Sequence, residues 1–371
     1  MNSSSFPGKL ALQQRVLPDY RTPFFDELAQ ACTGGLSVCA GLPRPQESIA
    51  VTDQLHNAEF VPVQNLHLLQ GSFYLCYQQG LLSWLENCSP DALVVEANPR
   101  YLATPAAIRW MKRRRKPVLG WGLGARSTSG GPICSVRQAR RTAFLRLFEA
   151  LITYSQKGAQ EYAQLGFPEE KIFVAPNAAA RRPTHPLPAR PAGFNGQPVV
   201  LFVGRLQARK RVDLLLQACA GLPAELQPRL VIVGDGPERK ILEGQAQKVY
   251  PAAQFPGAKH GEELAAYFSA ADLFVLPGTG GLAVQEAMSY GLPVIMGQGD
   301  GTNDQLVRPE NGWQIPPDDI SALAASMQLA LSDASRLRCL GAESYRIVRE
   351  EINLEKMVGV FIEALNSILV K

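Results

Sequence analysis

The sequence predicts an α/β fold made of two doubly wound domains with parallel sheets. Apolar runs of four or five residues alternate with helical segments in both halves of the chain, and this alternation is typical of parallel sheets covered by helices. A stretch rich in proline and glycine, 176–198, separates the two halves and predicts a linker. A length of 371 residues is ample for two domains with separate cores.

The first half contains the apolar runs of a parallel sheet. Thr22 and Pro23 mark one helix start, because Thr is a good N-cap and Pro fits the first helical position. A short edge strand is expected at 60–63, within a segment, 41–75, that is otherwise ambiguous. The other predicted strands are 10–17, 36–40, 92–95, 117–121, 151–154 and 172–175, and the predicted helices are 22–29, 78–86, 104–115, 137–150 and 156–165.

The second half repeats the alternation and ends in helices. Predicted strands are 199–203, 230–233, 253–255, 273–276 and 292–295, and predicted helices are 212–220, 238–248, 262–270, 282–288, 321–331, 334–350 and 354–369. No window reaches about 18 uncharged apolar residues, so no transmembrane helix is expected. The N-terminus lacks the apolar region of a signal peptide, and the seven cysteines form no CxxC pair, so we expect a cytoplasmic protein with reduced thiols.

The stretch 276–295 organises the second half. A buried strand leads into a loop with three glycines and then into a helix, and such a loop at a helix N-terminus suits a phosphate. Glu286 lies one turn into that helix, where a carboxylate can accept two hydrogen bonds from a ribose diol. These residues predict a pocket for a nucleotide diphosphate.

Four motifs carry a family resemblance. VVLFVGRLQARKR, VIVGDGP, FPGAKHGEELAAYFSAADLFVLPG and GGLAVQEAMSYGLPVI occur in this order over about 198–332. Together they resemble the C-terminal domain of family 4 retaining glycosyltransferases, which have the GT-B fold. The resemblance implies an acceptor-binding domain at 1–176, a sugar-nucleotide-binding domain at 177–352 that faces it across a cleft, and a C-terminal helix, 353–371, that packs on the first domain.

The resemblance also implies roles for individual residues. Arg205 and Lys210 match the cations that hold the diphosphate, and Glu286 matches the ribose-binding carboxylate; the alternative for the two cations is a plain surface position. A leaving diphosphate needs such cationic stabilisation. The other implied donor-binding positions are Gly204, Gly234, Asp235, Gly236, Gly257, Ala258, Lys259, Gly280, Gly281 and Leu282.

The sequence departs from the family pattern at two places. The family usually has two glutamates spaced E-x7-E, and the first, which helps hold the donor sugar, falls at Gly278 here. Either Asp235, Glu96 or a water replaces it, or the donor sugar differs. The common histidine of the N-terminal domain is also missing from its expected place near the loop Gly122-Leu123-Gly124.

Five residues of the first half are further candidates. Glu96 ends a buried strand, where open α/β sheets carry their sites, so it is a candidate catalytic base or acceptor contact, with a salt bridge to Arg100 as the alternative. Asn98 and Arg100 share its loop and are candidate acceptor contacts. Asp19 and Arg21 follow the first strand and are candidates for donor and acceptor contact, or plain turn residues.

Charge is unevenly distributed along the chain. Residues 1–185 hold 20 Lys and Arg against 13 Asp and Glu, whereas 186–371 hold 17 against 20. The run KRRRK at 112–116, with Arg137, Arg140, Arg141 and Arg146, is either a solvated helix end or a contact with an anionic membrane. It has no interleaved aromatic residues, so nucleic-acid binding is not expected.

These observations predict an enzyme: a retaining, sugar-nucleotide-dependent glycosyltransferase acting on a glycan, a lipid-linked or a small-molecule acceptor. Family frequency favours UDP as the nucleotide. Four scattered histidines and the lack of a DxD motif predict no metal and no cofactor. The alternative is a catalytically degenerate nucleotide-binding subunit, motivated by Gly278 and the missing histidine. A GT-B-fold epimerase or phosphorylase is a third, less favoured hypothesis.

Overall fold

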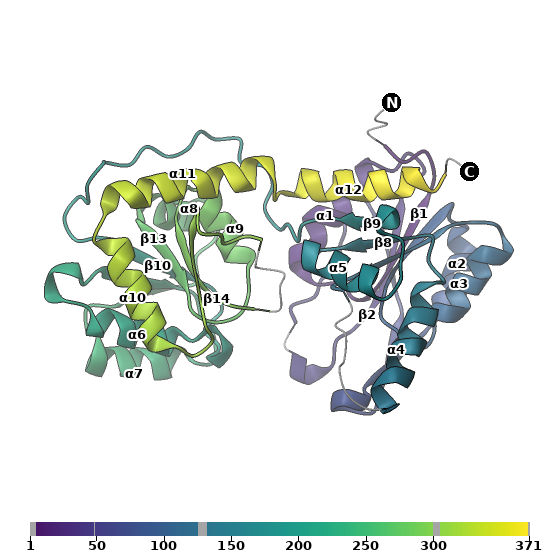
Figure 1. The fold of residues 1–371 in the computed structure, drawn as a ribbon, viewed down its shortest axis with the longest axis horizontal. Coiled ribbons are helices and arrows are strands. Elements are labelled where there is room, and N and C mark those ends of the chain that lie inside the picture. The colour runs from purple at the N-terminus through teal and green to yellow at the C-terminus, as the bar shows by residue number, and fades with distance from the viewer. Residues whose placement is uncertain (1–4, 48, 125–131, 300–304, 370–371) are drawn as a thin grey trace. The chain divides into compact units, whose positions relative to one another are not determined.

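The computed structural model describes residues 5–47, 49–124, 132–299 and 305–369 (Figure 1). The chain divides into two compact units. Unit 1 comprises 1–179 and 354–371, and unit 2 comprises 180–353. The last helix therefore belongs to the first unit, although it follows the second in the sequence.

Unit 1 is built on a seven-stranded sheet in the order β3-β2-β1-β6-β7-β8-β9, in which each neighbouring pair of strands is parallel. Its strands are β1 (Leu10–Val16), β2 (Leu36–Gly41), β3 (Glu59–Pro62), β6 (Ala92–Glu96), β7 (Val118–Gly122), β8 (Ala150–Thr153) and β9 (Ile172–Val174). Its helices are α1 (Thr22–Gln30), α2 (Leu81–Cys88), α3 (Thr104–Arg113), α4 (Pro132–Leu145), α5 (Gln156–Gln164) and α12 (Leu354–Ser367).

Two apolar cores cover the two faces of this sheet, because side chains alternate along a strand. On one face α12 lies against α1, β8 and β9 (Figure 1). There the Phe361 ring packs 5.0 Å from the rings of both Phe24 and Trp121. The other face is covered by α2 and α3 and by aromatic residues of the chain from α4 to α5, among them Phe144, Phe148 and Tyr162.

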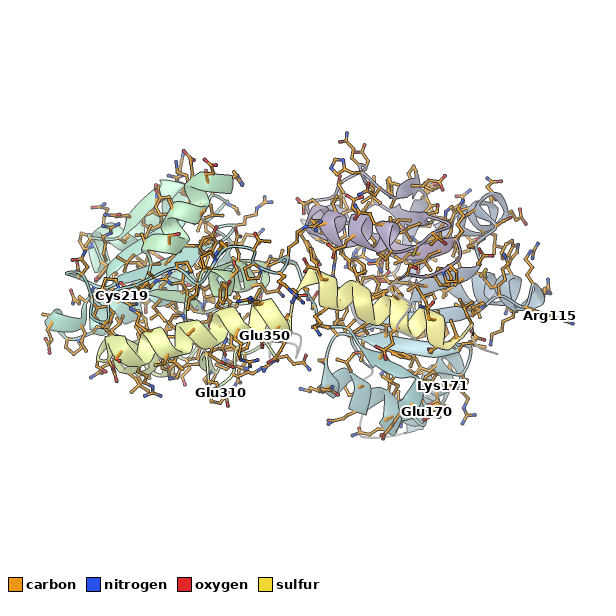
Figure 2. All side chains as sticks on the ribbon, turned by 90° about the horizontal axis from the view of Figure 1, so that it is seen from above. Arg115, Glu170, Lys171, Cys219, Glu310 and Glu350 are labelled. Carbon is orange, nitrogen blue, oxygen red and sulfur yellow. The ribbon has the colours of Figure 1, made fainter. Side chains whose placement is uncertain are left out.

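Unit 2 has a six-stranded parallel sheet in the order β12-β11-β10-β13-β14-β15. Figure 1 shows α6, α7 and α10 on one side of it and α8, α9 and α11 on the other. The strands are β10 (Val199–Val203), β11 (Arg229–Val233), β12 (Gln254–Gly257), β13 (Leu273–Leu276), β14 (Val294–Gly297) and β15 (Gly312–Ile315). The helices are α6 (Val212–Gly221), α7 (Arg239–Val249), α8 (Gly261–Ala270), α9 (Leu282–Ser289), α10 (Ile320–Leu331) and α11 (Ala334–Glu350), whose last residue is labelled in Figure 2.

The segment between β2 and α2 departs from the sequence prediction. The edge strand is present as β3, and the helix predicted at 78–86 is present as α2 but begins later. The unpredicted feature is an antiparallel hairpin formed by β4 (Gln64–Leu68) and β5 (Leu75–Gln79). Gly80, at φ +96°, ends β5, and α2 begins only at Leu81. Gln78 is buried and donates to the backbone carbonyl of Gln14 at 3.0 Å, which holds the hairpin against β1.

Two glutamines within β1 are buried rather than disruptive. Gln13 is fully buried. Its side-chain N–H donates to the side-chain oxygen of Gln78, and its own side-chain oxygen accepts the backbone N–H of Glu96 at 3.1 Å. Buried amides are tolerated when their hydrogen bonds are made. These glutamines connect β1 to the hairpin and to the end of β6.

The basic run at 112–116 lies at the end of α3. Lys112 pairs with Glu149 at 3.5 Å and Lys116 with Asp91 at 3.1 Å. Arg113 and Arg115 are exposed, and Figure 2 shows Arg115 projecting from unit 1. The side chain of Arg137 lies outside the described residues. Within the described ranges, no helix is long and apolar enough to cross a bilayer.

Candidate donor site and acceptor residues

Glycines join the carboxyl ends of three neighbouring strands in unit 2. The backbone N–H of Gly204, after β10, donates to Val233 at 3.0 Å, and that of Gly234, after β11, donates to Gly257 at 2.9 Å. A Cβ at Gly234 would lie 1.9 Å from the Gly204 carbonyl oxygen, so only glycine allows this approach. The predicted residues of these three loops are therefore brought together at one edge of the sheet.

Asp235 and Lys259 lie in these loops but have partners of their own. The Asp235 carboxylate accepts a hydrogen bond from the backbone N–H of Gly236 at 2.7 Å and forms an ion pair with Arg239 at 3.2 Å. Lys259 pairs with Glu263 at 3.3 Å, and its neighbour Ala258 is exposed. Asp235 is thus held at the start of α7.

The two predicted diphosphate cations have different environments. Arg205 is exposed and has no ion-pair partner among the described residues. Lys210 is half-buried, and its ammonium reaches toward the loop before α9: a Cβ at Gly280 would lie 2.2 Å from its Nζ. Desolvation, with a smaller effect of Arg209, lowers the pKa of Lys210 to about 8. A desolvated cation without an acidic partner in the described ranges is poised to bind an anion.

The N-terminus of α9 supplies donors beside this cation. Gly281 is the N-cap residue and makes no side-chain cap, so the first backbone N–H groups of α9, beginning at Leu282, are available to an anion. Gly280, at φ +125°, adopts a conformation that favours glycine. Lys210, the glycine loop and the helix N-terminus thus form one anion-binding arrangement within unit 2.

Glu286 lies one turn further along α9. Its side chain reaches the surface of unit 2, between the buried residues Gln285 and Ala287. The surrounding protein still removes enough water from the carboxylate to raise the pKa of Glu286 above its ordinary value. An accessible, partly desolvated carboxylate one turn from an anion site suits a diol ligand.

Gly278 has a structural reason for lacking a side chain. It is buried, and its N–H donates to the backbone carbonyl of Lys210 at 3.1 Å. A Cβ at residue 278 would lie 2.1 Å from the carbonyl oxygen of Arg209. The loop that presents Lys210 therefore occupies the space that a glutamate at this position would need.

Glu96 lies at the end of β6 in unit 1. Its Oε2 accepts the backbone N–H of Arg15 at 2.6 Å, and the predicted alternative of a salt bridge to Arg100 is not found among the described contacts. The Arg15 guanidinium pairs instead with Glu47 at 2.8 Å. Desolvation, partly offset by the Arg15 N–H, raises the pKa of Glu96 to about 7. This carboxyl group can therefore hold or release a proton near neutral pH.

Asn98, Arg100 and Asp19, three other candidates of unit 1, make local hydrogen bonds. Asn98 and Arg100 share a turn in which the Asn98 side chain accepts the Arg100 N–H at 3.1 Å, and Arg100 is exposed. Asp19 is exposed and caps its own turn by accepting the N–H of Tyr20 at 2.6 Å.

Arg21 is not an exposed turn residue. It is 5% exposed, donates to Asn177 at 2.7 Å and to Tyr154 at 3.2 Å, and lies over the rings of Trp121 and Tyr154. Its guanidinium therefore serves the packing of unit 1, and an acceptor reaches it only if these contacts open.

The sequence prediction missed some neighbours of the site. A pocket beside the loop before α6 is lined by side chains outside the predicted donor set: Gln207, Ala208, Arg211, Val212, Asp213, Glu238, Leu242 and Gln245. Arg211, at φ +54°, pairs with Asp213 at 3.2 Å and with Asp318. Among the described residues, no group of three or more His, Cys, Asp or Glu is arranged to hold a metal ion.

The second half of the chain matches a known protein family. The model of the family "Glycosyl transferases group 1" matches residues 188–346. This region of the chain is therefore similar to group 1 glycosyltransferase domains. The four sequence motifs that suggested such a domain all lie within the matched residues, and the glycosyltransferase resemblance is confirmed.

Relatives of this domain transfer different sugars. The chain is 38% identical over 169 residues to a GDP-mannose-dependent alpha-mannosyltransferase of Mycobacterium tuberculosis, which covers 43% of this chain and 42% of that protein. It is 31% identical over 163 residues to the sulfoquinovosyl transferase SQD2 of Arabidopsis thaliana, 42% of this chain and 30% of that one. The chain thus spans less than half the length of these curated relatives.

Solved structures share the fold of nearly the whole chain. Anabaena HepE in complex with UDP matches with a TM-score of 0.68 and 17% identity over 97% of this chain and 99% of that one. A glycosyltransferase from Rickettsia africae matches with a TM-score of 0.69 and 12% identity over 99% of each chain. The predicted GT-B fold, with two Rossmann-like domains, is confirmed. None of these similarities favours the degenerate-subunit hypothesis.

Proposed function

We propose that the chain is a retaining glycosyltransferase that moves a sugar from a nucleotide diphosphate sugar to a glycan or lipid-linked acceptor. The observation that carries this proposal is the Lys210 ammonium, desolvated and without an acidic partner in the described ranges, beside the N-terminus of α9. A diphosphate supplies the negative charge that this arrangement lacks. Arg205, exposed at the end of β10, adds a second cation, and Glu286 accepts hydrogen bonds from the ribose.

The proposed reaction needs little proton chemistry from the protein on the donor side. The bond between the sugar C1 and the phosphate oxygen breaks, and the acceptor oxygen bonds C1 on the same face. The acceptor proton goes to the leaving phosphate oxygen, and the nucleoside diphosphate departs. Lys210 and Arg205 stabilise the charge that develops on the diphosphate, which is the largest catalytic contribution expected of such a site.

GDP and UDP are the two candidates for the nucleotide of the donor. Three GDP-mannose-dependent relatives, 36–41% identical over the matched regions, favour GDP-mannose. The HepE structures with UDP and UDP-glucose are much less similar, at 17–18% identity, and keep UDP as the alternative. We therefore propose GDP-mannose as the first donor to test, in place of the UDP that family frequency suggested.

Thermal shifts with GDP, UDP, ADP and CMP, with and without Mg²⁺, test the donor site first. A ligand present at about 100 times its Kd stabilises the folded state by about 2.7 kcal/mol, which gives a measurable rise in Tm. The expected result is a rise with one nucleoside diphosphate that is independent of Mg²⁺ and is reduced in Glu286→Ala. No rise with any diphosphate contradicts the proposal and favours the degenerate-subunit hypothesis.

A ribose-modified ligand isolates the role of Glu286. Removing the ribose 2′- and 3′-hydroxyls should weaken binding to the natural protein by at least about 10-fold, since hydrogen bonds to a charged group contribute about 1.5–3 kcal/mol each. The same removal should change little in Glu286→Ala. Equal losses in both proteins would show that Glu286 does not bind the diol. Turnover of GDP-mannose and UDP-glucose, measured as released nucleotide, then tests the reaction itself.

A further inference from the structure

In the β4–β5 hairpin of unit 1, polar side chains point inward and apolar side chains point outward, the reverse of the usual arrangement at a solvent-exposed surface. Its inward side chains are mostly polar: Asn65, His67 and Gln78, with Cys76. Its outward side chains are mostly apolar, and Leu66, Leu68 and Tyr77 are exposed by 38%, 44% and 43%. In an ordinary half-buried hairpin the apolar face packs inward.

Hydrogen bonds fix the hairpin in this orientation. Asn65 donates to the carbonyl oxygens of Arg15 at 2.7 Å and Leu42 at 2.9 Å, and His67 bonds the Tyr74 hydroxyl at 2.8 Å. Gln78 donates to Gln14 from the other strand. Because side chains alternate along a strand, anchoring this polar set inward places its apolar neighbours outward.

A third segment extends the apolar face. The backbone of Cys76 in β5 donates to Arg100 at 3.0 Å and accepts from Leu102 at 2.9 Å. Tyr101 is buried with Cys76, whereas its neighbours Arg100 and Leu102 are exposed, Leu102 by 43%. The outward residues of the three segments include no acidic side chain, and one of them, Arg100, is a cation.

The tip of the hairpin is the most exposed part of this surface. Leu69 and Phe73 are 64% and 68% exposed, and Leu69 adopts φ +59°. A leucine in the left-handed region costs roughly 1 kcal/mol or more, which an asparagine or glycine would avoid. No Lys, Arg, Asp or Glu occurs anywhere in 60–85. Folding alone explains neither the strained leucine nor the uncharged, exposed tip.

We propose that this surface, the hairpin face, inserts into the interfacial layer of a membrane that contains anionic phospholipid. The hairpin face is Leu66, Leu68, Leu69, Phe73, Tyr77, Arg100 and Leu102. Apolar side chains at the tip bury among the upper acyl chains, and the Arg100 guanidinium meets lipid phosphates. A second copy of the chain fits less well, since a two-fold contact of this face would bring Arg100 toward its own counterpart without a carboxylate on the outward strands to pair with it.

The inference concerns where the proposed enzyme works, but its test does not depend on turnover. Vesicles of phosphatidylcholine, with and without phosphatidylglycerol, are sedimented with the full chain, and bound protein is measured. The decisive variant is Leu69→Asn combined with Phe73→Gln. Asparagine tolerates the left-handed conformation, so this variant should keep its Tm while its vesicle affinity falls by at least about 10-fold.

A charge control separates this surface from the basic run. Arg113→Gln combined with Arg115→Asn removes two exposed cations at the end of α3 and should leave at least half of the binding. Arg100→Gln should reduce the preference for phosphatidylglycerol. In a separate Phe73→Trp variant, the emission should shift to shorter wavelength on addition of vesicles.

Four results would overturn the proposal. One is that the natural chain binds neither kind of vesicle. The second is that the Leu69→Asn, Phe73→Gln variant binds as the natural chain does, and the third is that the basic-run control abolishes binding. The fourth is that the tip variant converts a dimer to a monomer without any vesicle binding, which would make the hairpin face an interface between copies. Donor-dependent turnover without vesicle binding would leave the proposed function intact and refute only this inference.

Discussion

The ammonium of Lys210 lies directly over Gly280, so that a Cβ there would come within 2.2 Å of Nζ. The cation and the glycine loop thus share one small space at the N-terminus of α9. Anything that enlarges residue 280 displaces the charge that is proposed to hold the diphosphate. Several tests of the donor site use this relationship.

Replacing Gly280 by alanine should weaken nucleoside diphosphate binding by at least about 10-fold, because it strains a backbone at φ +125° and moves a charge-assisted contact. Titration calorimetry with the diphosphate selected by the thermal-shift panel measures the loss. Gly244→Ala is the matched control: it lies on α7 with no atom near its would-be Cβ, and alanine there should slightly stabilise the helix. Unchanged affinity in Gly280→Ala would separate Lys210 from the diphosphate.

The charge of Lys210 should set an alkaline limit to the proposed reaction. Its pKa of about 8 lies below the ordinary lysine value, so the free enzyme loses this charge as the pH rises through about 8. We expect kcat/KM for the donor to fall above that pH, and Lys210→Arg, which stays charged, to lose this decline. Lys210→Ala and Arg205→Ala should each lower kcat by at least about 10²-fold. Initial rates measured from about pH 6 to about pH 10 test the expected fall of kcat/KM at alkaline pH. Undiminished kcat in both alanine variants would refute the catalytic roles of Lys210 and Arg205.

A glutamate cannot be restored at position 278 by substitution alone. Even alanine there meets the backbone of Arg209 and Lys210, and we expect Gly278→Ala to lower the free energy of unfolding by about 1–3 kcal/mol through overpacking. Gly278→Glu should lose donor binding rather than gain it. Denaturant unfolding and nucleotide titration measure the two effects. A stable Gly278→Glu variant with tighter donor binding would show that the loop adapts.

Glu96 should make stability and activity depend on pH near neutrality. Its folded-state pKa of about 7 is above the ordinary value of 4.5, so folding favours the protonated form. The stability that this proton supplies is complete below about pH 4.5 and is lost as the pH rises through 7. Glu96→Gln, which is neutral throughout, should be more stable than the natural chain by about 1–3 kcal/mol above pH 7 and no more stable at low pH.

The same variant tests Glu96 as the candidate acceptor contact. If its carboxylate accepts a hydrogen bond from the acceptor, turnover of the natural enzyme rises through about pH 7, and Glu96→Gln lacks that rise. Asp91→Asn is a suitable control. Asp91 directly precedes β6, the strand that Glu96 ends, and its exposed carboxylate pairs with Lys116. An identical pH profile in Glu96→Gln would leave the residue a structural role only.

Much of the fold follows from sequence patterns that are local. The buried strands of both sheets, their glycine loops and the helix starts marked by Thr22 and Pro23 depend on neighbouring residues, so they were predicted within a few positions. The hairpin was not, because its polar residues point inward and its leucines outward. Strand β15 was also missed: Gly312–Ile315 is short and pairs only with β14 at the edge of the sheet.

The site was predictable where a motif in one segment carries the chemistry. Lys210, Gly280 and Glu286 could be proposed as donor residues because their motifs are contiguous. Contacts between distant segments could not be: Arg21 is held by Tyr154 and Asn177, and Glu96 by the backbone of Arg15. The packing of Gly278 against Arg209 belongs to the same class, since nothing local to either residue indicates it.

The path of the chain through unit 1 has a consequence for synthesis. Unit 1 begins at the N-terminus, is interrupted by the whole of unit 2, and is completed by α12, whose Phe361 ring packs against Phe24 and Trp121. On a translating ribosome, unit 2 has all its residues before the first unit does. Unit 1 must wait with an open apolar face until α12 has been made, and a premature stop before residue 354 would remove one wall of its core. The first unit of the chain is thus completed only after the second unit has been synthesised.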